Sequence, residues 1–214
     1  MKLMKSIRWA GSVKAALGRG VFPHEMSFFL DLPWRNVMLS PQKLVARLAL
    51  AATSQVLEVG AGSGFYSVEV ARKISEGHLE LLDLQAEMLE KAQRKLEAEG
   101  LSNVGYTLAD AGLLPFKEDS FDALFLVAVL GEVANQQAFL SEARRVLKPG
   151  GVLSISEHLP DPDFSPFAKV KSLVEKEGFT FFERHGAKWS YTVNFRKSEA
   201  VRLGKGYATE SILC

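Results

Sequence analysis

Three alternating glycines follow a short apolar run in the first half of the chain. The segment 56–64 reads VLEVGAGSG, with Gly60, Gly62 and Gly64 as its glycines, and a helical pattern follows it. Glycine lets the backbone turn sharply and approach a ligand without a Cβ in the way, and open α/β sheets bind ligands at the carboxyl ends of their strands. The segment therefore predicts a site for a nucleotide-like molecule, although a plain tight turn after a strand would also explain it.

The spacing of these glycines argues against a dinucleotide. The dinucleotide fingerprint has its third glycine three residues after the second, and that position is Phe65 here. A nicotinamide-dependent oxidoreductase is therefore supported only by analogy of fold.

Two aspartates stand at the ends of the next two expected strands. Asp83 follows the glycine turn by about 20 residues, where an acid can accept hydrogen bonds from two ribose hydroxyls. Asp110 ends the third strand in the same way. Either acid alone could merely cap the following helix or turn. Two acids at successive strand ends after the glycine turn favour a ligand site.

The elements that position these residues alternate between strands and helices. Such alternation predicts βαβ units and a doubly wound, mostly parallel sheet. The expected strands are Gln55–Val59, His78–Asp83, Val104–Ala109, Phe121–Val127 and Val152–Glu157. The expected helices between them lie near Gly64–Ile74, Ala86–Glu99 and Gln136–Leu147, the last ended by Pro149-Gly150-Gly151.

Two β-rich runs near the end of the chain predict an antiparallel hairpin. They are Phe179–His185 and Lys188–Arg196, joined by a link that contains Gly186. The predicted fold class is therefore α/β, with a Rossmann-like doubly wound, mostly parallel seven-stranded sheet, a C-terminal antiparallel hairpin and an N-terminal helical cap. Residues 1–54 would form the cap over the carboxyl edge of the sheet, with helices around Ile7–Leu17, Glu25–Leu30 and Pro41–Leu50.

The composition of the chain argues against nucleic acid as a partner and favours a cytoplasmic protein. Lysine and arginine (26) nearly balance aspartate and glutamate (25), so no basic field for nucleic acid is expected. The only cysteine, Cys214, excludes an internal disulfide and suits the cytoplasm. No apolar run approaches the ~20 residues of a membrane span, and a soluble protein is expected. The basic stretch Lys2–Arg19 could touch a membrane, but a solvated lid helix is the favoured interpretation.

Four segments, in order, carry a family resemblance. VLEVGAGSGFYSVEVA and LLDLQAEMLEKAQRKL resemble the first motif and the second-strand acid of class I S-adenosylmethionine-dependent methyltransferases. ADAGLLPFKEDSFDALFLVAVLGEV and RVLKPGGVLSISE resemble the third to fifth strands of that family. The branch of similar enzymes includes the quinone-biosynthesis C-methyltransferases. Residues 55–214 are expected to be the methyltransferase domain.

The resemblance implies a role for each matching position. Glu58 and the backbone of Gly60, Ala61, Gly62 and Gly64 would hold the methionine portion of S-adenosylmethionine. Asp83 would bind the ribose hydroxyls, and Leu84 would flank the adenine. Asp110 would accept from the adenine amino group beside the Ala111 backbone, and Val127 or Ala128 would offer a carbonyl to the methionine ammonium. No metal site is predicted, and the product would be S-adenosyl-L-homocysteine.

The acceptor side is less defined. Relatives often have Glu-His or His-His after a leucine that follows the fourth strand, whereas this chain has Leu130-Gly131-Glu132-Val133. Glu132 and His158 are the candidate bases, and a solvated or helix-capping glutamate is the alternative for Glu132. A small-molecule acceptor, possibly lipophilic, could contact aromatic and basic side chains, with core packing as the alternative. These side chains are Phe28, Phe29, Trp34, Arg35, Trp189 and Tyr191. The missing histidine also leaves open a module that binds the cofactor without catalysis.

Overall fold

The computed structural model describes residues 39–198 of the chain. The expected helices at 7–17 and 25–30, the basic stretch 2–19 and the aromatic residues 28, 29 and 34 lie outside the described residues. None of the helices within 39–198 is long and apolar enough to cross a membrane.

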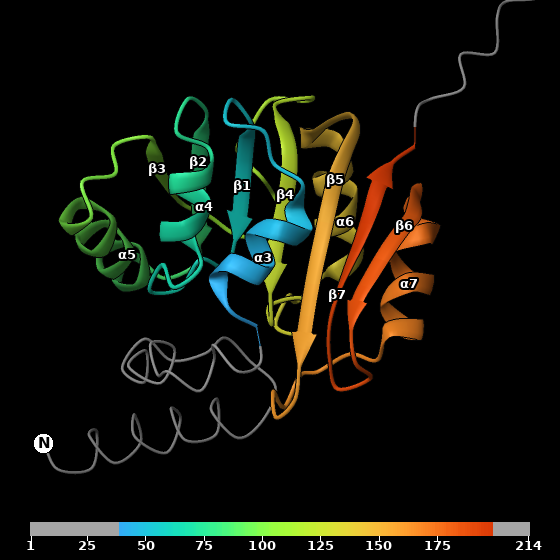
Figure 1. The fold of residues 1–214 in the computed structure, drawn as a ribbon. Coiled ribbons are helices and arrows are strands. Elements are labelled where there is room, and N and C mark those ends of the chain that lie inside the picture. Colours follow the sequence, from blue (N-terminus) through green and yellow to red (C-terminus); the bar gives the residue numbers. More distant parts are fainter. Residues whose placement is uncertain (1–38, 199–214) are drawn as a thin grey trace, which may run out of the picture.

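One seven-stranded sheet forms the centre of the molecule, with the strand order β3-β2-β1-β4-β5-β7-β6 (Figure 1). Strands β1 to β5 are parallel, and β7 pairs antiparallel with both β5 and β6. The strands are β1 Gln55–Val59, β2 His78–Asp83, β3 Val104–Leu108, β4 Phe121–Val127, β5 Leu147–His158, β6 Phe179–Gly186 and β7 Ser190–Lys197. The predicted α/β class, the doubly wound sheet and the terminal hairpin are confirmed.

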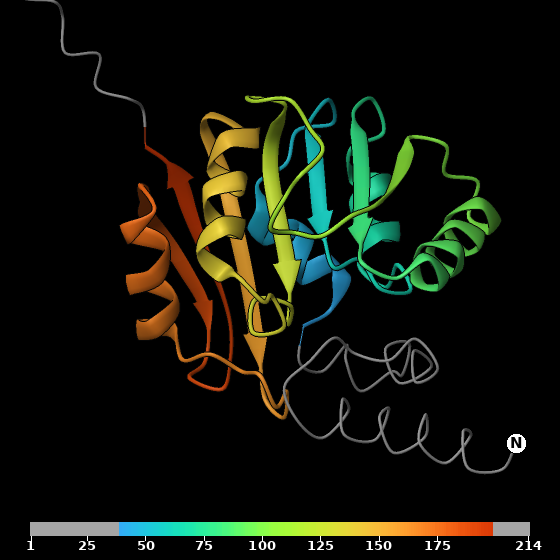
Figure 2. The same ribbon diagram turned by 180° about the vertical axis from the view of Figure 1, so that it is seen from behind.

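Helices cover both faces of the sheet and divide the core into two hydrophobic clusters. On the face seen in Figure 1, α3 and α4 lie over the sheet, and they share one cluster with α5. The opposite face, seen in Figure 2, is covered by α6 and α7, which belong to the second cluster. The helices are α3 Pro41–Leu48, α4 Ser67–Lys73, α5 Ala86–Ala98, α6 Gln136–Val146 and α7 Phe167–Lys176.

Several elements differ from the predictions. Helix α4 begins at Ser67 because Gly64 has a φ of +76°, which is not helical. Strand β5 begins at Leu147, where a helix end and a Pro-Gly-Gly turn were expected. Helix α7 was not predicted at all; it follows Pro166 and buries Val170 and Val174 against the sheet.

The last helix of the expected cap lies elsewhere. Helix α3 packs on the face of the sheet rather than over its carboxyl edge, because Leu44 and Leu48 are buried in the same cluster as Val56 and Phe125. The helix ends at Leu48, two residues before the predicted end, and Ala49 follows it with a φ of +50°. This segment is therefore part of the sheet's own core.

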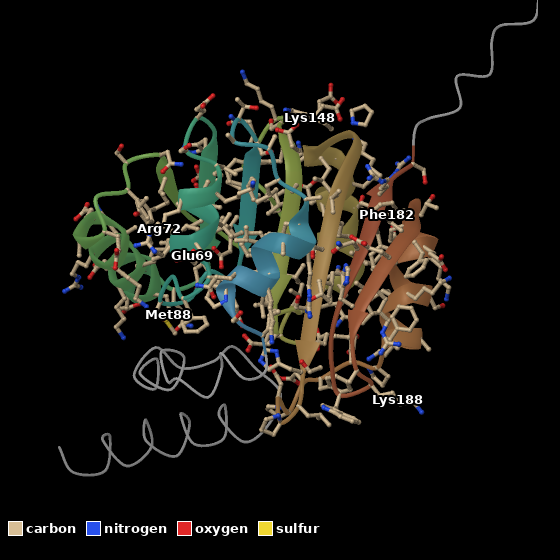
Figure 3. All side chains as sticks on the ribbon, in the orientation of Figure 1. Glu69, Arg72, Met88, Lys148, Phe182 and Lys188 are labelled. Carbon is tan, nitrogen blue, oxygen red and sulfur yellow. The ribbon has the colours of Figure 1, made fainter. Side chains whose placement is uncertain are left out.

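The carboxyl ends of four parallel strands meet at one edge. In Figure 1 the arrowheads of β1, β4 and β5 point to this edge, and in Figure 3 Lys188 at the turn between β6 and β7 lies there too. The strands end at Val59, Asp83, Val127 and His158. Open parallel sheets bind their ligands at such an edge.

Candidate active site

The turn after β1 consists of left-handed glycines. Gly60, Gly62 and Gly64 have φ angles of +71°, +54° and +76°, in the region where a Cβ is disfavoured. The backbone N–H groups of Gly60 and Ala61 both donate to Leu82 O, at 2.8 and 3.2 Å. The turn is therefore held against the end of β2.

Two of these glycines also lack room for a side chain. A Cβ on Gly60 would lie 2.5 Å from Val129 Cγ2, and a Cβ on Gly64 would lie 3.1 Å from Ala92 Cβ of α5. Val129 follows β4, so the glycine turn packs directly against the segment after β4. The turn is fixed between this segment and α5.

Asp83 connects the glycine turn to the turn after β2. Its Oδ2 accepts from Gly62 N at 2.9 Å and its Oδ1 accepts from Gln85 N at 3.0 Å. The carboxyl is only 7% exposed, and burial raises its pKa although these N–H donors oppose the shift. The backbone N–H of Leu84 is a third donor to this carboxylate, so the chain itself fixes the orientation of Asp83.

Glu58 is the residue of β1 that contacts the helix after the glycine turn. Its side chain is buried, and its Oε2 accepts from Ser67 Oγ at 2.6 Å. Ser67 is the first residue of α4, so this hydrogen bond ties β1 to the start of the helix that follows the glycine turn. The structure gives Glu58 a direct role in positioning this helix.

The turn after β3 presents polar and apolar groups to solvent. Ala109 N donates to Asp83 O at 3.1 Å, which places this turn beside β2. Asp110 is exposed, and its Oδ1 accepts from Gly112 N at 2.6 Å within its own turn. Ala111 is partly buried. Three leucines at or after the ends of β2 and β3 are uncovered: Leu84 (51% exposed), Leu108 (59%) and Leu113 (76%).

The segment after β4 has an unusual backbone. Val127 is buried, and Ala128 has a φ of +57°, which costs about 1–2 kcal/mol for a residue other than glycine. Ala128 N donates to Ser156 O of β5 at 2.8 Å. Strained backbone of this kind is concentrated at ligand sites. The segment 127–129 thus joins the glycine turn on one side to β5 on the other.

The two candidate bases occupy different environments. Glu132 is partly buried in a turn in which its N–H donates to Val129 O at 2.9 Å. His158 is the last residue of β5 and is buried at 5% exposure, followed by a cis peptide bond between Leu159 and Pro160. Both residues follow neighbouring strands that end at the carboxyl edge.

The structure adds an acid that the sequence-based choice of bases left out. Glu157 is 2% exposed, its Oε2 accepts from Ser165 N at 3.1 Å, and its Oε1 has no partner in residues 39–198. Burial raises the pKa of Glu157 to about 7, and the nearby carboxylates of Asp161 and Asp163 add to the shift. The position of Glu157 beside His158 at a strand end was the sequence signal that could have identified it. The sequence does not show that its side chain is buried.

A cavity of about 420 Å³ opens between the loop after β4 and the loop after β5. It is lined by Gly131, Val133, Ala134, Asn135, Gln136, Pro162, Asp163, Phe164, Ser165 and Lys169. Ser165 belongs to this lining and is also the residue bound to Glu157.

The two hairpin aromatics differ in exposure. Trp189 is 61% exposed, whereas Tyr191 is 1% exposed and donates to Ser165 O at 2.5 Å. Tyr191 packs edge-on against Phe164 and Phe167, which agrees with the core-packing alternative.

Comparison with known proteins gives one family and several relatives. Residues 56–151 match a family described as a methyltransferase domain. The chain is 33% identical over 133 residues to a ubiquinone/menaquinone biosynthesis C-methyltransferase of Ruegeria sp. (strain TM1040), covering 62% of this chain and 51% of the relative. It is 36% identical over 132 residues to a demethylmenaquinone methyltransferase of Tropheryma whipplei, with the same coverage. The chain spans about half the length of these relatives.

Solved structures share the fold. A methyltransferase from Aquifex aeolicus, described as dependent on S-adenosylmethionine, superimposes with a TM-score of 0.78 at 24% identity. The match covers 83% of this chain and all of that one. The [4+2]-cyclase SpnF superimposes with a TM-score of 0.67 at 20% identity, covering 73% of this chain and 79% of that one. The same fold therefore also carries chemistry other than methyl transfer.

Proposed function

We propose that this chain transfers a methyl group to a small-molecule acceptor. It belongs to the class I S-adenosylmethionine-dependent methyltransferases, in the branch of the quinone-biosynthesis C-methyltransferases. The observation that carries the proposal is the contact between Asp83 and Gly62, with their 2.9 Å hydrogen bond. It joins the glycine turn and the acid at the end of β2 into one unit at the carboxyl edge.

The residues present fit the cofactor. The left-handed glycine turn brings the backbone to the carboxyl edge without side chains, the Asp83 carboxylate is a hydrogen-bond acceptor at the end of β2, and Leu84 offers an uncovered apolar surface for a flat ring. We therefore assign the ribose hydroxyls to Asp83 and the adenine to Leu84, Asp110 and the Ala111 backbone. The methionine portion is assigned to Glu58, Gly60, Ala61, Gly62 and Gly64, with a carbonyl from Val127 or Ala128.

The bound cofactor supplies an electrophilic methyl on a sulfonium, so the protein has little covalent chemistry to perform. Its residues must hold the acceptor close and in line and keep water out. An acceptor that is protonated at neutral pH must also lose a proton. Glu132 and His158 remain the proposed bases. Glu157 joins them, since its pKa of about 7 suits a proton acceptor.

The acceptor is proposed to be a lipophilic small molecule. This rests on the names of the relatives, which methylate ubiquinone or menaquinone precursors according to those names. The cavity between the loops after β4 and β5 is a place where part of it could lie. A cytoplasmic location completes the proposal.

Transfer of a labelled methyl group tests the proposal. The full chain is incubated with S-adenosylmethionine carrying a labelled methyl and with demethylmenaquinol in detergent micelles, and label in the organic phase is counted. Transfer by the wild type that is lost in Asp83→Ala and kept in Glu90→Ala would support it. Glu90 is an exposed residue of α5 paired with Arg94. Absence of transfer together with absence of cofactor binding would refute it.

A further inference from the structure

The two faces of strands β5 and β7 differ in chemistry. The face toward α6 and α7 is hydrophobic and contributes Leu153, Ile155, Tyr191, Val193 and Phe195 to the core. The opposite face carries buried polar side chains, namely Ser154, Ser156, His158, Thr192 and Asn194. Burying polar groups costs free energy unless they find partners. This polar face therefore needs an explanation.

Arg47 of α3 lies over the polar face. Its guanidinium Nη1 donates to Thr192 Oγ1 at 2.8 Å, and Thr192 Oγ1 lies 2.7 Å from Ser156 Oγ. Asn194 Nδ2 donates to the Arg47 carbonyl at 2.7 Å. The side chain and the backbone of Arg47 are thus both held by β7.

The positive charge of Arg47 has no counterion in the part of the chain that the structure describes. The side chain is partly buried, and burial lowers the pKa of its guanidinium. A guanidinium has five N–H donors, and Thr192 takes one of them. On the same face, Ser154 Oγ and Asn194 Oδ1 have no partner within residues 39–198. A partly buried cation with unused donors favours an anionic ligand.

The polar face leads to the proposed site of methyl transfer. Ser156 pairs with Val127 of β4, and its carbonyl accepts from Ala128 N at 2.8 Å. His158 is two residues further along β5, so its side chain lies on the same face and at the carboxyl edge. The Thr192 hydroxyl therefore links Arg47 to Ser156 of β5, the residue whose carbonyl binds Ala128.

We propose that Arg47, supported by Thr192 and Ser156, binds an anionic oxygen of the methyl acceptor, such as a carboxylate or a phenolate on a ring. The planar fork of arginine matches a carboxylate in bidentate geometry. Arg47 then sets which acceptors fit and how they are oriented toward Ala128. The inference rests on the proposed function, since it takes the ligand to be the acceptor.

A charged probe and its neutral analogue test the inference. The full chain, saturated with S-adenosyl-L-homocysteine, is titrated with benzoate and with benzamide, and binding is followed by the arginine Nε–H resonance that disappears in Arg47→Gln. We expect benzoate to shift this resonance and to bind at least ~10-fold more tightly than benzamide, as a lost charged hydrogen bond implies. Equal binding of the two probes would overturn the inference.

Variants separate recognition from folding. Arg47→Gln should weaken benzoate about 10-fold or more, and Arg47→Lys should restore part of the affinity because it keeps the charge and loses the fork. Thr192→Val should weaken benzoate less than Arg47→Gln does. The control Arg94→Gln, in an exposed ion pair on α5, should bind like the wild type. If Arg47→Gln is unfolded, Arg47→Lys and Thr192→Val decide, and wild-type affinity in both would overturn the inference.

The result is independent of the proposed function's own test. Binding of S-adenosyl-L-homocysteine without discrimination between benzoate and benzamide would remove the anion site and leave the methyltransferase proposal intact. Lack of cofactor binding would remove the methyltransferase proposal, and with it the identification of the ligand as a methyl acceptor.

Discussion

The carboxyl edge of the sheet has two halves that satisfy their polar groups differently. At the ends of β1 and β2, both oxygens of Asp83 accept backbone N–H groups, from Gly62 and from Gln85. At the end of β5, Glu157 Oε1 has no partner within residues 39–198, and on the face of β5 and β7 the guanidinium of Arg47 from α3 has no counterion among these residues. The first half is preorganised by its own backbone. The second half has charges that a ligand could match.

This difference fits two kinds of ligand. A cofactor that is the same in every turnover is well served by a rigid turn, because preorganised groups need no rearrangement on binding. An acceptor is recognised by charges and hydrogen bonds that favour one molecule over its analogues. Buried polar groups without partners lower the free energy of unfolding, so substitutions that remove them from the acceptor half should stabilise the protein. The predictions below follow from that contrast.

The largest effect is expected in the cofactor half, for Gly60→Ala. The new Cβ would lie 2.5 Å from Val129 Cγ2 at a φ of +71°, so unfolding free energy should fall by about 3 kcal/mol and cofactor binding should be lost. Gly100→Ala is the matched control, because Gly100 has the same φ of +71° and open space around it. It should cost about 1 kcal/mol and leave binding unchanged. Chemical denaturation and calorimetric titration measure both, and equal losses in the two variants would contradict the packing argument.

Asp83→Asn should weaken cofactor binding and lower stability together. The affinity for S-adenosyl-L-homocysteine should fall about 10- to 100-fold, since hydrogen bonds to a charged group are worth about 1.5–3 kcal/mol. The cofactor-free protein should also lose about 1–3 kcal/mol of stability, because Asn has a single acceptor oxygen and leaves the backbone N–H of Gly62 or of Gln85 without its acceptor. Calorimetric titration and thermal unfolding provide the two readings. A variant with intact affinity would show that Asp83 serves the fold alone.

In the acceptor half, Glu157→Gln should make the protein more stable than the wild type above neutral pH. Burial raises the pKa of Glu157 from 4.5 to about 7, so the folded state holds a proton that the unfolded state has already lost. Wild-type stability should therefore decline as pH rises from about 4.5 to 7, by on the order of 2 kcal/mol, and the variant should escape this loss. Its melting temperature should exceed that of the wild type at pH 8 and match it near pH 4.5.

Glu142→Gln provides a control of opposite sign. The hydrogen bond from Arg145 lowers the pKa of Glu142, so this carboxylate stabilises the protein once it is ionised. The Gln variant should be less stable than the wild type at pH 8, with the difference shrinking in acid. The same pH profile for the Glu142 and Glu157 variants would refute the assignment of a buried, proton-holding Glu157.

The smallest effect is expected for Ala128→Gly. Relief of the left-handed φ of +57° should add about 0.5–1 kcal/mol to stability, after allowing for the entropy of glycine. Ala49→Gly, at a φ of +50° after α3, should gain as much without altering methyl transfer. Slower transfer in Ala128→Gly alone would show that the strain orients this segment. Equal transfer rates in both variants would assign the strain to the fold only.

The sequence predicted the cofactor half better because its signals are local. Strands β1 and β2 have the predicted bounds, and the glycine turn and Asp83 are each identified from neighbouring residues. The acceptor half depends on tertiary contacts. Arg47 meets Thr192 across 145 residues of sequence, and no local pattern announces such a contact.

Elements without strong local signals were missed for the same reason. Helix α7 begins after Pro166 with no side-chain cap and buries only Val170 and Val174. Glu157 resembles an ordinary strand-end acid until its burial is known. Ala128 shows no sign in sequence of its left-handed backbone. Residue type therefore predicted where a ligand would bind, while the fold showed which buried polar groups lack partners within residues 39–198.

The most direct test of the central claim is calorimetric titration of the full chain with S-adenosyl-L-homocysteine and, separately, with NADH. The account predicts saturable binding of one S-adenosyl-L-homocysteine per chain, kept in Gly100→Ala, lost in Gly60→Ala, and no binding of NADH. A folded wild-type chain that binds NADH, or neither molecule, would contradict the claim that the glycine turn and Asp83 form a site for the methyl-donor cofactor.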